Sequence, residues 1–186
     1  MSALRHFSGS RRRWLVGAGV ALAAAAAGAW FAQRRYTPRA PADLAVETLL
    51  AQTLTDSDGN SVALSRYRGR VLVVNFWATW CPPCIEEMPE LSALASEFAA
   101  RGVDVLGIGV DAAVSIRQFA ARWPVVYPLL IAQKTGYELS RQFGNRSLAL
   151  PFTVVVDRDG RIIERTLGRF KADALRASTE SALRGS

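Results

Sequence analysis

Metal-binding side chains are scarce in this sequence. Its 186 residues include one histidine, two cysteines and two methionines. A structural zinc site normally needs four cysteine or histidine ligands, and a copper carrier normally uses histidine. The histidine, His6, precedes a long apolar run, so the chain beyond that run has no imidazole. We therefore expect no metal, no cofactor and no cysteine–histidine nucleophile pair.

Acidic residues are absent from the first 42 positions. Seven arginines precede Asp43, whereas 16 basic and 16 acidic residues lie from Asp43 onward. The formal net charge of +7 therefore belongs to the N-terminal segment. Because nucleic-acid binding needs a clustered surplus of positive charge, we expect no nucleic-acid partner for the rest of the chain.

The apolar run from Trp14 to Ala32 is uncharged and lies between two arginine clusters. As a helix its residues would span about 28 Å, enough for a bilayer core. Two interpretations remain open: an uncleaved anchor with Trp14 and Trp30 at the interfaces, or a secretory signal cleaved after residues 27–29. Residues 10–16, SRRRWLV, also resemble a twin-arginine export signal. Either interpretation predicts export, and we expect a periplasmic domain tethered to the inner membrane.

The chain divides into a signal anchor or signal peptide at 1–33, a proline-containing linker at 34–45 and a folded domain at 46–186. Two short strand-like runs around Asp58-Gly59 predict an N-terminal hairpin. Further strands are predicted at 70–78, 103–110 and 127–132, helices at 82–101, 113–123, 135–144 and 171–184, and a second hairpin turning at 159–160. This pattern predicts an α/β domain whose mixed sheet is covered by helices on both faces.

Three positions of the predicted helix at 113–123 are candidates for the core, namely Val114, Phe119 and Trp123. Pro89 lies inside the helix at 82–101 and should kink it, because proline has no backbone donor.

Both cysteines lie in the segment FWATWCPPC, where Cys81 and Cys84 are separated by two prolines. A purely structural disulfide between them would close a very small loop, so it would lower the entropy of the unfolded chain little and stabilise the fold little. A redox couple fits the context better, because Cys81 follows a buried strand where the next helix begins. The helix dipole and free N–H groups stabilise a thiolate there, and Pro82 and Pro83 leave the donors of Cys84 and Ile85 for it. Cys81 is then the exposed attacking thiol and Cys84 the more buried resolving one.

The segments SRYRGRVLVVNFWATWCPPCIEEMPEL and LPFTVVVDRDGRII resemble the thioredoxin superfamily, in particular its TlpA/ResA branch of membrane-tethered thiol-disulfide oxidoreductases. The resemblance covers about residues 46–184 and implies a thioredoxin-like fold. It further implies that Leu150-Pro151 is a cis peptide that lies against the cysteines and pairs with a substrate strand; a trans proline that starts a strand is the alternative. We expect Trp80, Pro82 and Pro83 to contact the substrate as well.

The same resemblance identifies Asp111 as a carboxylate near the cysteines. It is a candidate proton acceptor for Cys84, and a helix N-cap is the alternative role. In thioredoxins a buried aspartate occupies the position of Asn75, which cannot titrate. Because Asn75 cannot accept the proton of Cys84 in this way, Asp111 is the stronger candidate for the proton acceptor.

The charges after the cysteines favour a reductant. Glu86 and Glu87 follow within one turn and oppose a thiolate on Cys81, so the couple should lean toward donating electrons. The alternative is that they are ordinary acidic residues at a helix N-terminus, where the dipole favours them. The branch implies substrates in cytochrome c maturation or in copper-site assembly of an oxidase, and a membrane protein as electron donor. The alternatives are a disulfide-forming oxidase with the same couple, or a non-enzymatic assembly protein or metallochaperone. We expect a monomer.

Overall fold

The computed structural model describes residues 28, 30 and 41–185 of the chain. Two compact units are distinguished, residues 1–39 and 40–186, and the fold is that of the second. The predicted anchor at 14–32 lies outside the described residues except for two positions. Among the helices that are described, none has both the length and the apolar character needed to cross a bilayer.

A single mixed sheet forms the centre of the second unit. Its strand order is β2-β1-β5-β4-β3-β6-β7. β3 is an inner strand that runs parallel to β4 but antiparallel to β6, and the β1–β2 and β6–β7 pairs are antiparallel hairpins. The strands are β1 (Thr53–Asp56), β2 (Ser61–Ala63), β3 (Val71–Trp77), β4 (Val103–Gly109), β5 (Leu129–Ile131), β6 (Phe152–Val156) and β7 (Ile162–Leu167).

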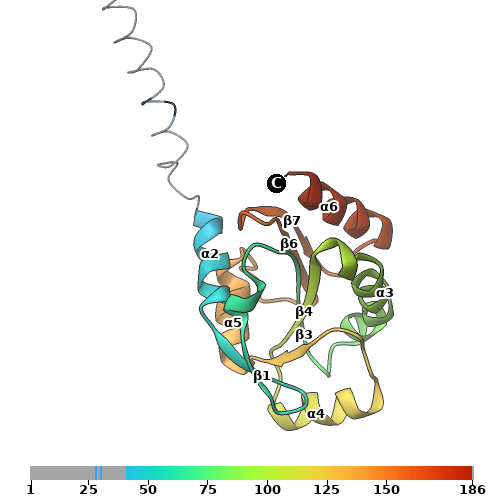
Figure 1. Cartoon of the computed structure of the whole chain (residues 1–186). Helices are drawn as coiled ribbons and strands as arrows, with labels where there is room; N and C mark the ends of the chain where they lie inside the picture. The colour runs from blue at the N-terminus through green and yellow to red at the C-terminus, as the bar shows by residue number, and fades with distance from the viewer. Residues whose placement is uncertain (1–27, 29, 31–40, 186) are drawn as a thin grey trace, which may run out of the picture. The chain divides into compact units, whose positions relative to one another are not determined.

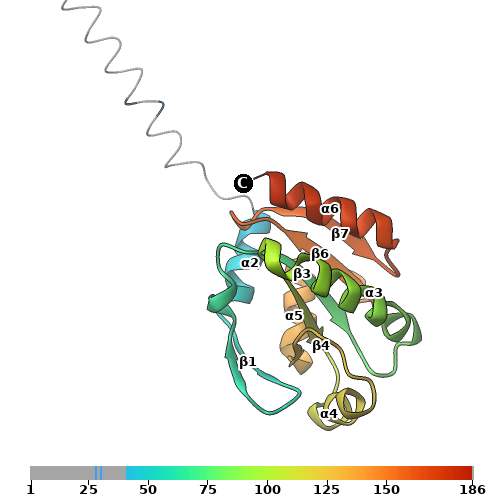
Figure 2. The same ribbon diagram turned by 45° about the vertical axis from the view of Figure 1, so that its right-hand side comes forward.

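Helices cover both faces of the sheet, as the sequence predicted (Figure 1). Alternate residues of β3 point to opposite faces, which explains why all seven are buried. Val71 and Val73 pack with residues of α3, α4 and α6, while Leu72 and Val74 pack with residues of α2 and α5. Figure 2 shows the same two layers from a second direction. The helices are α2 (Pro41–Leu50), α3 (Pro82–Phe98), α4 (Ala113–Arg122), α5 (Gln133–Gln142) and α6 (Ala172–Arg184), with 3-10 turns at Leu64–Tyr67 and Ala99–Arg101.

One detail differs from the sequence-based expectations at the N-terminal end. Residues 41–45, expected in a linker, belong to helix α2, and Ala45 and Val46 are buried in the core. Helix α3 contains Pro89, as expected, and continues past it to Phe98, while the kink at Pro89 stays a prediction. The 3-10 turn that follows ends at Gly102, whose φ of +85° suits glycine.

The core positions predicted for α4 were wrong at two of three residues. Phe119 is buried, but Val114 and Trp123 are 59% and 60% exposed. Ile116 is the fully buried side chain of this helix instead. Because Ile116 and Phe119 lie three residues apart, they define one core face, and Val114 falls on the opposite side.

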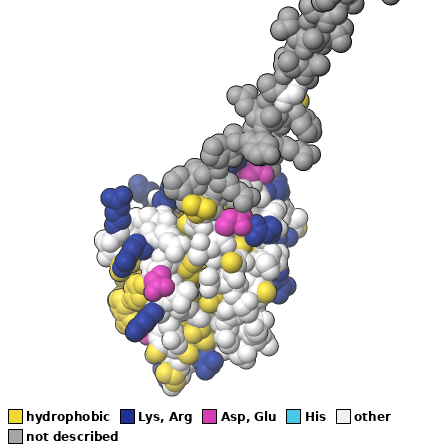
Figure 3. Space-filling model, turned by 90° about the vertical axis from the view of Figure 1, so that its left-hand side faces the viewer, with side chains coloured by type: hydrophobic (Ala, Val, Ile, Leu, Met, Phe, Trp, Pro, Cys, Tyr) yellow, Lys and Arg dark blue, Asp and Glu magenta, His cyan; other side chains and the backbone are white. Residues whose placement is uncertain are grey.

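The surface carries charges of both signs. On the side that Figure 3 presents, basic and acidic side chains are interspersed, with apolar side chains gathered at one margin. Several exposed arginines are paired with carboxylates on other elements, such as Arg68 with Glu47 at 2.7 Å and Arg176 with Glu97 at 2.8 Å. Such exposed pairs contribute little stability each.

Candidate functional site

The two cysteines form a disulfide at the N-terminus of α3. Cys81 is the N-cap of the helix, Pro82 and Pro83 are its first two residues, and the Cα atoms of Cys81 and Cys84 are 5.3 Å apart. β3 positions this turn, because it ends at Trp77 four residues earlier. The turn closes with the N–H of Cys81 donating to the carbonyl of Ala78 at 3.2 Å. The site therefore lies at the carboxyl end of β3.

Cys81 is less exposed than the sequence predicted. It is 4% exposed and Cys84 is 0% exposed, so the expected order holds but both sulfur atoms are largely buried. The N–H groups of Cys84 and Ile85 were expected to face the Cys81 sulfur. In this disulfide form they donate instead to the Cys81 carbonyl oxygen, at 3.0 and 3.3 Å. The Cys81 side chain, although it stands at the N-cap position, therefore accepts no capping hydrogen bond from the backbone of α3.

The residues expected to contact a substrate surround the disulfide to different extents. Trp80 is 62% exposed, Pro82 is exposed and Pro83 is half-buried. The Leu150–Pro151 peptide is cis. Phe76 pairs with Phe152, so Pro151 lies beside the end of β3 that leads to the cysteines. Leu150 packs against the core cluster that contains Cys81 and Cys84.

Asp111 lies in the loop between β4 and α4. One of its carboxylate oxygens accepts a hydrogen bond from the hydroxyl of Thr79, two residues before Cys81. The other accepts from the N–H of Ala112 at 2.6 Å. Ala112, rather than Asp111, is the N-cap residue of α4. Asp111 therefore ties the loop that precedes the cysteines to the end of β4.

A second carboxyl group, Glu87, lies in the core behind the disulfide. Its side chain has no exposed surface and comes from α3, three residues after Cys84. Asn75 Nδ2 donates to Glu87 Oε1 at 2.6 Å and also to Thr153 Oγ1 at 3.0 Å. Helix α3 and strands β3 and β6 are thus joined by one buried polar network.

Burial dominates the acidity of this group. It raises the pKa of Glu87 to about 7, although the hydrogen bond from Asn75, the nearby backbone N–H of Phe170 and the charge of Arg169 lower it in part. Burial also raises the pKa of Tyr127, and the negative charge of Glu87 adds to that effect. Glu87 Oε2, Asn75 Oδ1, Trp77 Nε1 and the Tyr127 hydroxyl have no hydrogen-bond partner within the described part of the chain. The interior behind the disulfide is therefore polar and incompletely paired.

The two glutamates have different surroundings. Glu86 is exposed and forms an ion pair with Arg169 at 3.0 Å, which offsets its charge. Glu87 is buried, and burial raises its pKa to about 7, so it ionises less readily than an exposed glutamate. The opposition of both carboxylates to a Cys81 thiolate stays a prediction, because the two cysteines are joined in a disulfide here.

Sequence reasoning missed Glu87 as a candidate proton acceptor, although a signal was present. The buried residues of α3 are Cys84, Glu87, Met88, Leu91, Leu94 and Phe98. Apart from the adjacent Glu87 and Met88, they recur every three or four residues and define the core face of the helix. A carboxyl at such a position must be buried, and an amide at position 75 of the facing strand is a suitable partner for it.

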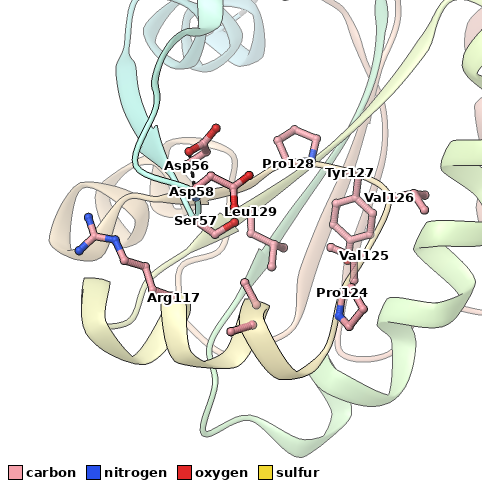
Figure 4. Close-up of a pocket in the computed structure, with 12 residues that line it drawn as sticks. Asp56, Ser57, Asp58, Arg117, Pro124, Val125, Val126, Tyr127, Pro128 and Leu129 are labelled. Atoms are coloured by element: carbon pink, nitrogen blue, oxygen red, sulfur yellow. Dashed lines mark hydrogen bonds between the residues drawn. The ribbon is translucent and has the colours of Figure 1, made fainter.

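A hollow of about 500 Å³ lies apart from the cysteines, between the β1–β2 turn, α4 and residues 124–129 (Figure 4). Asp58 and Arg117 lie toward one side of it, and Pro124, Val125 and Leu129 supply apolar walls. The nearby Asp56 carboxylate is already engaged, because it accepts from the N–H groups of Asn60 and Asp58 at 2.8 and 3.0 Å. Tyr127 lines the hollow and connects its wall to the core around Glu87.

The known proteins that resemble this chain include several named for thiol-disulfide chemistry. Thiol-disulfide oxidoreductase ResA of Geobacillus kaustophilus is 31% identical over 129 residues, which cover 69% of this chain and 72% of the relative. ResA of Bacillus thuringiensis subsp. konkukian is 28% identical over 116 residues and is matched over 65% of its own length. A putative thiol:disulfide interchange protein DsbE from Chlorobium tepidum superposes with a TM-score of 0.62 at 26% identity, covering 71% of this chain and 92% of that one.

These likenesses confirm the thioredoxin-like fold that the sequence predicted. The family model for Redoxin matches residues 40–183, which include the whole sheet, the disulfide and Glu87. This chain therefore belongs to the Redoxin family.

Proposed function

We propose that this chain is a thiol-disulfide oxidoreductase that donates electrons to disulfides of exported proteins. The observation that carries the proposal is the Cys81–Cys84 disulfide at the start of α3 with a buried carboxyl, Glu87, one helical turn beyond it. The relatives named thiol-disulfide oxidoreductases support the class of reaction.

The first step belongs to Cys81, the more exposed of the two cysteine residues. In the reduced protein its thiolate attacks one sulfur of a substrate disulfide, a mixed disulfide forms and the other substrate sulfur leaves as a thiolate. Trp80 and Pro82 are exposed beside this sulfur and can contact the substrate. The chain around cis Pro151 offers a backbone edge at the end of β6 for the same purpose.

The second step needs a proton acceptor for Cys84. Cys84 attacks the Cys81 sulfur and releases the second substrate thiol, and only its thiolate is nucleophilic. Glu87 follows Cys84 by three residues, so both side chains lie on one face of α3 with their Cβ atoms roughly 5–6 Å apart. A carboxyl with a pKa of about 7 can accept a proton at neutral pH and release it again. Asp111 is the second candidate for this role.

The direction of electron flow follows from what stabilises the Cys81 thiolate. The first turn of α3 consists of Pro82, Pro83 and Cys84 and contains no basic residue. The N–H groups of Cys84 and Ile85 are already donated to the Cys81 carbonyl. Strongly oxidising proteins of this fold have a high reduction potential because their attacking thiolate is strongly stabilised. Weak stabilisation of the Cys81 thiolate therefore favours a reductant.

The setting of the reaction is proposed from the N-terminal segment. Residues 14–32 direct export, the folded domain is held at the outer face of the inner membrane, and a membrane protein supplies electrons to the disulfide. Cytochrome c maturation or copper-site assembly of an oxidase provides the substrates. A periplasmic reporter enzyme fused after Ser186 should be active, and activity of a cytoplasmic reporter alone would contradict the export.

The reduction potential tests the proposal directly. The protein is equilibrated with glutathione or dithiothreitol buffers, and the fraction of free Cys81 and Cys84 is measured by alkylation and mass spectrometry. A reductant should have a potential below about −200 mV, whereas a value near −120 mV is typical of a strong oxidant. A reduction potential near −120 mV would contradict the proposed reductant and favour a disulfide-forming oxidase instead. Trapping the mixed disulfide with Cys84→Ser then identifies the substrate on Cys81.

A further inference from the structure

An apolar groove of about 410 Å³ begins one residue beyond the disulfide. Ile85, Met88 and Pro89 of α3 form one wall, and Phe119, Arg122 and Trp123 at the end of α4 form the other. Figures 1 and 2 both show α4 lying beneath α3 at this side of the molecule. Cys84 directly precedes Ile85 on α3, so the groove begins within one residue of the redox couple along this helix.

Trp123 is exposed and yet held in place. It is 60% exposed, and its ring is stacked on the ring of buried Phe119 with centroids 6.3 Å apart. Phe119 in turn contacts Trp77, at the end of β3, with centroids 5.1 Å apart. A large aromatic side chain that is fixed before binding loses little entropy in a complex, which is typical of residues that dominate protein interfaces.

The α3 wall offers a backbone acceptor. In a helix the N–H of residue 89 would donate to the carbonyl of Ile85, but Pro89 has no N–H. The Ile85 carbonyl can therefore accept a hydrogen bond from the backbone of a segment bound in the groove.

One charged side chain, that of Arg122, lies among the described residues that line the groove, and it is exposed. Glu86 and Glu90 flank the α3 wall in the sequence, but both form ion pairs with Arg169. An occupant with an acidic residue beside its apolar side chain is therefore favoured over one with a basic residue.

We propose that this groove binds the protein substrate through a large apolar side chain, preferably next to an acidic residue, close to the cysteine that Cys81 attacks. The inference rests on the proposed function and adds a specificity site to it. Ile85 and Ser92 lie four and eleven residues after Cys81, roughly 6 and 17 Å along the helix axis. An extended chain covers about 3.3 Å per residue, so the apolar side chain lies two to five positions from the reactive cysteine.

The test uses reduced full-length protein and symmetric disulfides of single-cysteine peptides. Attack by Cys81 on either sulfur gives the same mixed disulfide and one free peptide. Attack by Cys84 then frees the second peptide and leaves the protein disulfide, so two electrons pass to the substrate. One peptide carries phenylalanine four residues from its cysteine, one carries it ten residues away and one carries alanine; glutathione disulfide serves as a small substrate.

The wild-type protein should react about tenfold faster with the peptide that has phenylalanine at four residues than with the other two, the discrimination expected for one large side chain in an apolar pocket. Trp123→Ala should lower this preference to twofold or less, and Trp123→Phe should restore part of it. Leu44→Ala, an equally exposed apolar residue on α2, should retain the full preference. Aspartate beside phenylalanine should accelerate the reaction and lysine slow it, and Arg122→Gln should remove that difference.

Reduction of glutathione disulfide without any preference among the peptides would overturn the groove and leave the proposed function intact. Failure to reduce any of these disulfides would overturn the proposed function itself. A dimer in sedimentation that Trp123→Ala dissolves would assign the groove to a second copy of the chain and also overturn the proposal.

Discussion

Replacing Glu87 by glutamine tests whether the buried carboxyl lowers the stability of the fold. Burial raises the pKa of Glu87 from 4.5 to about 7. In the unfolded chain the group ionises near its ordinary value, whereas in the folded protein it resists ionisation. The unfolded state therefore binds fewer protons between these two values, and the free energy of unfolding falls as pH rises through that range.

The size of the effect follows from the difference between the two pKa values. A shift from 4.5 to about 7 costs roughly 3 kcal/mol at pH 8, about 2 kcal/mol at pH 6 and almost nothing at pH 4. Glutamine does not ionise, and its oxygen can still accept the hydrogen bond from Asn75. We therefore expect Glu87→Gln to exceed the wild type in stability by roughly 3 kcal/mol at pH 8 and to match it at pH 4.

Urea unfolding of the oxidised wild type and the variant at pH 4, 6 and 8 measures this difference. All other titrating groups are common to both proteins, so their contributions cancel when the two free energies of unfolding are subtracted. A difference that stays constant across the three pH values would refute the reasoning, because it would show that Glu87 ionises equally in the folded and unfolded states.

Two further outcomes concern the chemistry of the site. Alkylation of the reduced protein with limiting iodoacetamide should label Cys81 before Cys84, since Cys81 is 4% and Cys84 0% exposed. Mass spectrometry of the peptides measures the order of labelling. Preferential labelling of Cys84 would reverse the assignment of the attacking and resolving thiols. In single-turnover reduction of a disulfide peptide, Glu87→Gln should slow clearance of the mixed disulfide roughly 100-fold while leaving its formation almost unchanged. Asp111→Asn should slow clearance less, because both Asp111 oxygens already accept hydrogen bonds from Thr79 and Ala112; the reverse order would make Asp111 the proton acceptor.

The features that could be predicted from the sequence are those set by local patterns. The continuous apolar run at 71–77 predicts a strand buried on both faces, and β3 is buried at every position. The Asp159-Gly160 turn predicts the β6–β7 hairpin, and Gly160 has the φ of +79° that such a turn requires. The two prolines after the buried strand likewise fit the predicted helix start at Pro82, where α3 begins.

The features that were missed depend on contacts between distant segments. Trp123 was expected in the core because it is large and apolar, but Phe119 and Ile116 already fill the face of α4 that packs on the sheet. The role of Glu87 depends on Asn75 and Thr153, which are separated from it by 12 and 66 positions and meet it only when β3, β6 and α3 assemble. Its pKa follows from that assembly rather than from the neighbouring residues in the sequence.

The four unpaired polar atoms around Glu87 have a consequence for protein engineering. Asn75, Trp77, Glu87 and Tyr127 lie in a core where each polar atom without a partner costs free energy. A screen that rewards heat resistance alone should therefore recover replacements at Asn75, Glu87 and Tyr127 early, and several of them should be inactive. The redox site therefore lies beside the part of the core that contributes least to the free energy of unfolding. Substitutions meant to raise thermal stability without loss of activity are best placed at positions remote from α3 and the end of β3.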